Sequence, residues 1–130
     1  MKTGRTTEYG LIAISYIAQR YPSGPVMAQK VAKAYTIPAE YLLKILQQLV
    51  RANVLRSKRG PRGGFWLSRP PAEITLLEVI EAIEGPVVTH MNLAEQTGNE
   101  PFSLKIEQVC REVAENVRDA YGKIKISELL

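Results

Sequence analysis

The chain has 130 residues, of which 45% are hydrophobic and 23% charged, so its composition is that of an ordinary folded domain and excludes a disordered or fibrous protein. Its net charge of +4 is unevenly spread: residues 1–70 hold 12 Lys and Arg against two Asp and Glu, whereas residues 71–130 hold five against 11. This asymmetry predicts that the first part of the chain meets a polyanion, the alternative being a protein whose surface charge is merely uneven.

We expect a cytoplasmic protein with no membrane contact. The single cysteine, Cys110, leaves no intrachain disulfide and favours a reducing compartment. Lys2 and Arg5 precede an apolar run over residues 9–18, but polar residues interrupt this run and no small-residue cleavage site follows it. No stretch approaches the roughly 18 apolar residues needed to cross a bilayer.

The first predicted helix runs from Thr6 or Thr7 to Arg20, with one of the threonines as its N-cap. Its apolar residues fall on two stripes, so we expect it to be buried on two sides. The stripes consist of Tyr9, Ile12, Ala13, Tyr16 and Ile17, and of Leu11, Ile14 and Ala18. A turn at residues 21–25 (YPSGP) ends this helix, and a second helix follows over residues 27–35.

The third predicted helix, over residues 38–52, has one apolar and one polar face. Pro38 suits the first helical position. The apolar stripe comprises Leu42, Ile45, Leu46, Leu49 and Val50. The outer face comprises Glu40, Lys44, Gln47 and Arg51, with Ala39 and Tyr41 near the first turn. Such a helix can lie in a DNA major groove, where its first turn reaches the base edges, although every amphipathic helix has a polar face.

A strand over residues 54–58 and its partner over residues 65–67 flank the turn RGPRGG and predict a hairpin. Four cations surround this turn: Arg56, Lys58, Arg59 and Arg62. A structural hairpin needs glycines but not clustered like charge, whereas contact with phosphates or with a minor groove would explain the cations. We therefore interpret residues 55–67 as the wing of a winged helix-turn-helix, with a plain hairpin as the alternative. Phe65 and Trp66 lie on opposite faces of the second strand. We expect both to pack in the core, the alternative being that one packs on the first helix and the other is partly exposed near a sugar-phosphate backbone.

The second half of the chain begins with a capping box at residues 75–78 (TLLE), which predicts a helix that ends at Gly85-Pro86. Residues 87–100 show no period and are interpreted as a loop. A longer helix over residues 102–124 carries a narrow apolar seam on a charged surface, and a last short helix begins near residue 127. The seam consists of Ile106, Cys110, Val113, Val117, Ala120 and Ile124. It predicts pairing of two such helices in a dimer, with burial against its own domain as the alternative.

With these residues in view, the chain resembles the Rrf-two family of bacterial winged-helix transcription regulators, which includes the iron–sulfur cluster regulator and the nitric-oxide-sensitive repressor. The resemblance covers nearly the whole chain. Its most specific motifs are residues 54–71 (VLRSKRGPRGGFWLSRPP), 74–76 (ITL) and 84–86 (EGP), and Val31-Ala32 and Tyr41-Leu42 also match.

This resemblance implies a homodimer, joined through the long C-terminal helix, that binds a partly palindromic promoter site. It also implies that the first turn of the third helix enters the major groove and that the wing contacts the adjacent minor groove or backbone. The candidate DNA-binding residues are Ala39, Glu40, Tyr41, Lys44, Gln47, Lys58, Arg59 and Arg62. The candidate dimerisation residues are those of the seam.

The chain departs from the family at the cluster ligands. Cluster-binding members carry three cysteines between the Gly-Pro stop and the long helix, and a fourth ligand elsewhere, whereas this interval contains no cysteine here. His90 and Cys110 could form a mixed metal site with nearby carboxylates. The alternative is that His90 is a solvated loop histidine and Cys110 a small buried thiol. We therefore expect no metal and no cofactor. A signal, if there is one, must come from a small molecule, a partner protein or the thiol of Cys110.

These observations predict a mainly α fold with a small β-hairpin. Residues 1–73 form a winged helix-turn-helix region, and residues 74–130 supply a connecting helix, a loop and a long dimerisation helix. The favoured function is a sequence-specific transcriptional repressor that binds double-stranded DNA as a homodimer. The alternative is a winged-helix module for protein–protein contact, which would not need such a density of positive charge. An enzyme has little support, because the sequence contains no phosphate loop, no metal-ligand spacing and no nucleophile placed for its one histidine.

Overall fold

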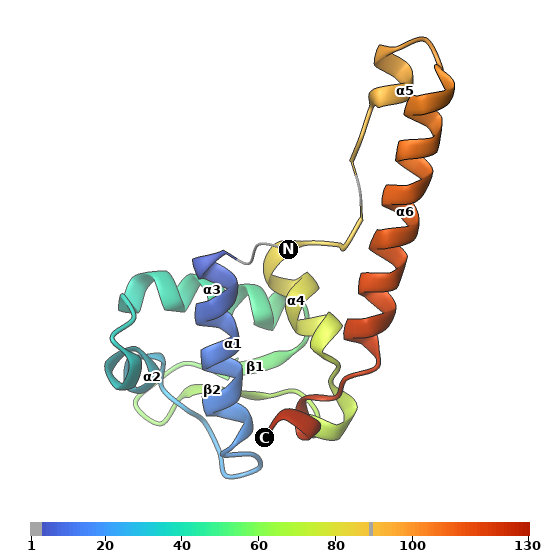
Figure 1. The fold of residues 1–130 in the computed structure, drawn as a ribbon. Coiled ribbons are helices and arrows are strands. Elements are labelled where there is room, and N and C mark those ends of the chain that lie inside the picture. Colours follow the sequence, from blue (N-terminus) through green and yellow to red (C-terminus); the bar gives the residue numbers. More distant parts are fainter. Residues whose placement is uncertain (1–3, 89) are drawn as a thin grey trace.

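The computed structural model describes residues 4–88 and 90–130, and the fold is mainly α-helical with one two-stranded hairpin, as predicted (Figure 1). The elements in chain order are α1 (Arg5–Ala18), α2 (Ala28–Tyr35), α3 (Ala39–Arg51), β1 (Leu55–Lys58), β2 (Gly64–Leu67), the 3-10 helix η1 (Pro71–Glu73), α4 (Leu76–Glu84), α5 (Leu93–Gln96), α6 (Pro101–Gly122) and the 3-10 helix η2 (Ile126–Leu129).

Two of the predicted local features are wrong. Neither threonine caps the first helix: Gly4 is the N-cap of α1, and Thr7 lies inside the helix, where its hydroxyl donates a hydrogen bond to Glu84. The predicted loop over residues 87–100 contains the short helix α5, whose four residues are too few to show a period. The hydroxyl of Thr7 is engaged by a residue 77 positions away, which a local capping pattern does not report.

The core is built where α1, α3 and α4 meet. Four residues of the predicted apolar stripe of α3 are buried, with Leu42, Leu46 and Leu49 fully covered, whereas Val50 is half-buried. Gly10 lets α1 approach the other two helices, because a Cβ atom there would lie 2.3 Å from Cδ1 of Ile83. This packing leaves the opposite face of α3 turned outward.

The wing is attached to the helix-turn-helix by backbone hydrogen bonds. Strands β1 and β2 pair antiparallel, with Leu55 opposite Leu67 and Lys58 opposite Gly64. The N–H of Val26 donates to the carbonyl of Phe65, and the N–H of Phe65 donates to the carbonyl of Val26, both at 2.8 Å. Residue 64 must be glycine, because its φ is +142° and a Cβ there would lie 2.5 Å from the Val26 carbonyl oxygen. The hairpin is thereby fixed beside the start of α2.

Helix α4 starts at the predicted capping box, in which Thr75 and Glu78 exchange both side-chain hydrogen bonds. The C-terminal segment returns to this point: the N–H of Leu76 donates to Ile124 at 2.8 Å, and the N–H of Ile126 donates to Ile74 at 2.9 Å. The end of α6 is therefore closed onto the start of α4.

An arm extends from the core, and we define it as α5 together with the N-terminal half of α6. A polar contact lies where α6 meets the core. Arg118 pairs with Glu81 of α4 at 2.7 Å, and the same carboxylate accepts from the N–H of Val87 at 2.8 Å. At the far end, Thr97 donates to Ser103 at 2.8 Å and so folds α5 back onto α6. Figure 1 shows the arm projecting well beyond the remaining helices.

No helix among residues 4–88 and 90–130 is both long and apolar enough to cross a membrane.

Candidate nucleic-acid interface

The outer face of α3 presents polar side chains to solvent, as its pattern predicts. Because the opposite stripe is buried, the residues on this face are exposed. They are Ala39, Glu40, Leu43, Lys44, Gln47 and Arg51. All the candidate major-groove residues of this helix are therefore accessible, and Leu43 joins them although the sequence did not single it out.

Tyr41 is also exposed, but its hydroxyl is tied back to the first helix. Its oxygen is hydrogen-bonded to the hydroxyl of Thr6, and its ring meets that of Tyr9 edge to face, with the centroids 5.7 Å apart. These contacts hold the first turn of α3 against α1. Tyr41 is thus placed to orient the helix as well as to reach a ligand.

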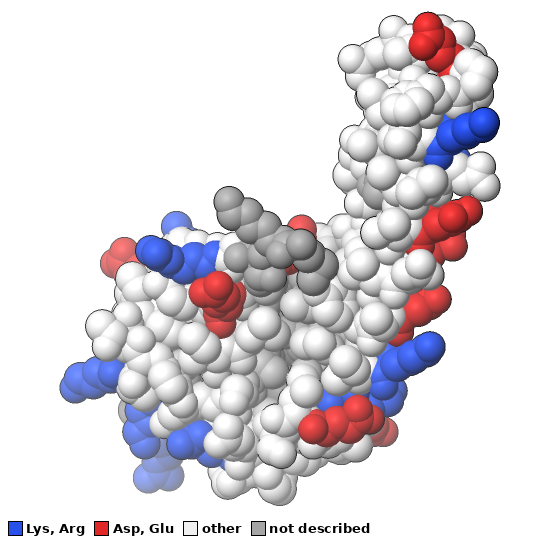
Figure 2. Space-filling view, viewed as in Figure 1, with Lys and Arg blue, Asp and Glu red and all other residues white. Residues whose placement is uncertain are grey.

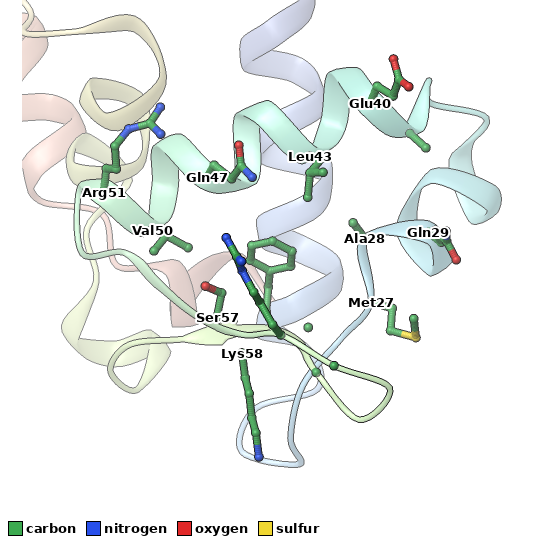
Figure 3. Close-up of a pocket in the computed structure, with 16 residues that line it drawn as sticks. Met27, Ala28, Gln29, Glu40, Leu43, Gln47, Val50, Arg51, Ser57 and Lys58 are labelled. Atoms are coloured by element: carbon green, nitrogen blue, oxygen red, sulfur yellow. The ribbon is translucent and has the colours of Figure 1, made fainter.

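A groove of about 660 Å³ separates α3 from the wing (Figure 3). Its α3 side includes Glu40, Leu43 and Gln47, and its floor includes Val50 and the buried ring of Phe65. Figure 3 shows Leu43 and Val50 directed toward the wing side of α3. Helix α3 and the wing therefore face one continuous concave surface.

The three candidate wing cations, Lys58, Arg59 and Arg62, are exposed, and none of them forms an ion pair within residues 4–88 and 90–130. Lys58 and Arg59 border the groove, although the side chain of Lys58 extends away from α3 in Figure 3. Arg69, close behind the hairpin, is already engaged, because it pairs with Glu78 at 2.6 Å. The tip of the wing therefore carries exposed positive charge that no acidic side chain of the described residues pairs with.

The two aromatic residues of β2 differ in how far their side chains are buried. Phe65 is 8% exposed and lies under the groove, whereas Trp66 is half-buried and lines a hollow of about 210 Å³ beside Ile17 and Tyr21. The prediction of core packing is confirmed for Phe65 but is only partly met by Trp66.

Lys30 and Lys33 on α2 extend the cationic surface, although neither is among the predicted DNA-binding residues. They are exposed and line a hollow of about 740 Å³ that reaches Ala39 at the start of α3. Figure 2 shows Lys and Arg gathered over α2 and the wing, whereas both signs of charge occur along the arm. The signal that could have found them is their sequence position, one helix before α3 on the basic half of the chain.

The apolar seam of α6 is only partly exposed. Val113 and Ala120 are exposed, whereas Cys110, Val117 and Ile124 are half-buried within the protomer. The stripe that reaches the surface instead follows alternating steps of four and three: Phe102, Val109, Val113, Asn116 and Ala120 are exposed, and Ile106 between the first two is half-buried. Phe102 is 72% exposed and Val109 53%, and both were missed in the sequence because the predicted seam was placed on the neighbouring positions.

The donor set does not suit an iron–sulfur cluster. Across the described residues, no group of three or more His, Cys, Asp or Glu side chains is arranged to hold a metal ion. Cys110 is half-buried in the middle of α6, and His90 is exposed in the segment before α5. A cluster needs four ligands, and these two residues cannot supply them.

Residues 3–127 match the family model described as "Rrf2: Iron-dependent Transcriptional regulator". BadM of Rhodopseudomonas palustris is 31% identical over all of this chain and 81% of its own length. The HTH-type transcriptional regulator CymR of Bacillus subtilis is 30% identical over 67% of this chain and 63% of its own length. The solved structure of CymR, the global cysteine regulator of B. subtilis, matches with a TM-score of 0.80 at 26% identity over 99% of this chain and 95% of that one.

The sequence matches do not extend over the full length of the curated relatives. They span from about half of a relative in Aquifex aeolicus (52%) to 81% of BadM.

Proposed function

Because this chain belongs to the Rrf2 family of transcriptional regulators, we propose that it recognises a specific, partly palindromic promoter sequence as a homodimer and acts there as a repressor. The named relatives are transcriptional regulators rather than enzymes, and DNA binding is the activity that they share with this chain.

One observation carries the proposal: the outer face of α3 and the cationic tip of the wing border the same groove (Figure 3). In this arrangement α3 enters the major groove, with Glu40, Lys44 and Gln47 at the base edges, while Arg59 and Arg62 meet the adjacent backbone or minor groove. A winged-helix module for protein contact would not need unpaired cations at this tip.

The homodimer is supported by the exposed stripe on α6. Exposed apolar residues at alternating steps of four and three are typical of the a and d positions of paired helices. Phe102, Val109 and Val113 are more than half exposed in the protomer, which is costly unless a second surface covers them. Two copies joined through α6 would present two copies of α3 to one duplex, and this matches a palindromic site.

The decisive experiment starts from a random duplex library. The purified protein should select a palindromic sequence whose half-sites lie about one helical turn apart, and binding should weaken steeply as salt rises. A reporter gene placed behind the selected sequence should be expressed less when the protein is present. Failure to enrich any sequence would contradict specific recognition, and raised expression would contradict repression.

The family description refers to iron, but the donor set of this chain does not fit an iron–sulfur cluster. We therefore propose no iron-dependent step for it.

A further inference from the structure

Leu43 is an apolar side chain on the polar face of the recognition helix. It is 40% exposed, whereas its neighbour Leu42 is fully buried. Glu40 stands one turn before it and Gln47 one turn after it, and all three line the groove between α3 and the wing (Figure 3). Leu43 therefore lies where base edges would lie in a bound duplex.

The protomer does not need Leu43 for its core. The buried stripe of α3 is complete with Leu42, Ile45, Leu46 and Leu49, and the groove floor is already apolar because of Val50 and Phe65. A leucine held at the surface gains free energy only when another apolar group covers it. On a helix face that meets DNA, this group has to be part of the DNA.

The major groove offers one apolar group on its base edges, the C5-methyl of thymine. Phosphates are charged, the C–H groups of the sugars lie on the backbone and are the same for every base, and the other base edges present hydrogen-bond donors and acceptors that leucine cannot satisfy. Resting on the proposed DNA binding, we propose that Leu43 is a specificity-determining residue that selects a thymine in each half-site by contact with its methyl group.

The polar neighbours complete this recognition. A carboxylate such as that of Glu40 accepts from the amino group of cytosine, and an amide such as that of Gln47 pairs with adenine. Leu43 lies between them on the helix, so the selected thymine falls in the centre of the bases read by α3.

The test removes the methyl group without changing the base pairing. The wild-type protein first selects its site from a random duplex library, and each thymine of that site is then replaced by deoxyuridine, one position at a time. At one position per half-site, the replacement should weaken wild-type binding about fourfold, the value of one buried methylene-sized group. The Leu43→Ala protein should bind the thymine and deoxyuridine duplexes equally at this position.

Leu43→Met is the matched variant, because methionine is apolar and has a volume close to that of leucine, so it should retain the preference for thymine. Both variants should unfold at the wild-type temperature, since the side chain lies outside the core. The proposal is overturned if the selected half-sites contain no thymine, if no deoxyuridine position weakens wild-type binding, or if Leu43→Ala shows the same fourfold loss as wild type. If the wild-type protein binds no duplex at all, the proposed function itself fails, and this result is distinct from the other three.

Discussion

The buried hydroxyl of Thr7 donates a 2.5 Å hydrogen bond to Oε2 of Glu84, and this contact ties the first turns of α1 to the last residue of α4. The preceding residue, Thr6, holds the hydroxyl of Tyr41 at the start of α3. The hydrogen bonds of these two adjacent threonines therefore link the start of α3 and the end of α4 through α1.

Replacing Thr7 with valine should lower the free energy of unfolding by about 1 kcal/mol, because the shape is kept while a hydrogen bond to a carboxylate is lost. The measurement is urea denaturation followed by circular dichroism. Thr7→Ser is the control, since it retains the hydroxyl and should keep the hydrogen bond. A valine variant as stable as wild type would show that the contact does not contribute to stability.

Replacing Arg59 or Arg62 with alanine should reduce the salt dependence of DNA binding. Each phosphate neutralised contributes a slope of about −0.9 to log K against log salt, so each variant should flatten the slope by up to that amount. Fluorescence anisotropy over a salt series measures it. Arg111→Ala removes the same charge from the exposed surface of α6 and should leave the slope unchanged. Wing variants with the wild-type slope would contradict the assignment of the wing to DNA.

Replacing Lys44 with alanine should change which sequence is bound, because a lysine in the major groove discriminates guanine from the other bases by about 1–3 kcal/mol. Repeating the library selection with the variant would show relaxed preference at one position of each half-site. Lys33→Ala is the comparison. Lys33 lies on α2, outside the face of α3, so its loss should weaken binding to all DNA sequences alike. A uniform loss for Lys44→Ala would argue against base reading.

The elements of the fold could be predicted from the sequence because their signals are local. The period of the α3 core stripe and the capping box between Thr75 and Glu78 each depend on residues only a few positions apart. The contacts that position the site join distant residues, as in the bridge between Val26 and Phe65, and no local period reports them.

The same distinction explains what was missed at the two surfaces. Leu43 is absent from the predicted core stripe, and its spacing from Glu40 and Gln47 places it on their face of the helix, but the pattern does not show that an apolar residue there borders a groove formed with the distant wing. On α6, the inner side is the one that contacts α4, where Arg118 pairs with Glu81; Val117 next to it is half-buried, whereas Val109 is exposed. The sequence could show that the helix has an apolar stripe, but not which neighbouring positions lie free.

Replacing Val113 with glutamate should convert the proposed dimer into monomers. Val113 is 54% exposed in the centre of the stripe, and pairing through α6 would bring two carboxylates into an apolar interface, where unpaired charge is strongly unfavourable. Sedimentation velocity measures the change, and DNA affinity should fall with it. Leu104→Glu is the matched control, because Leu104 is 47% exposed and lies about half a helical circumference away. A Val113→Glu protein that remains dimeric, or a Leu104→Glu protein that dissociates equally, would place the interface on another face of the molecule.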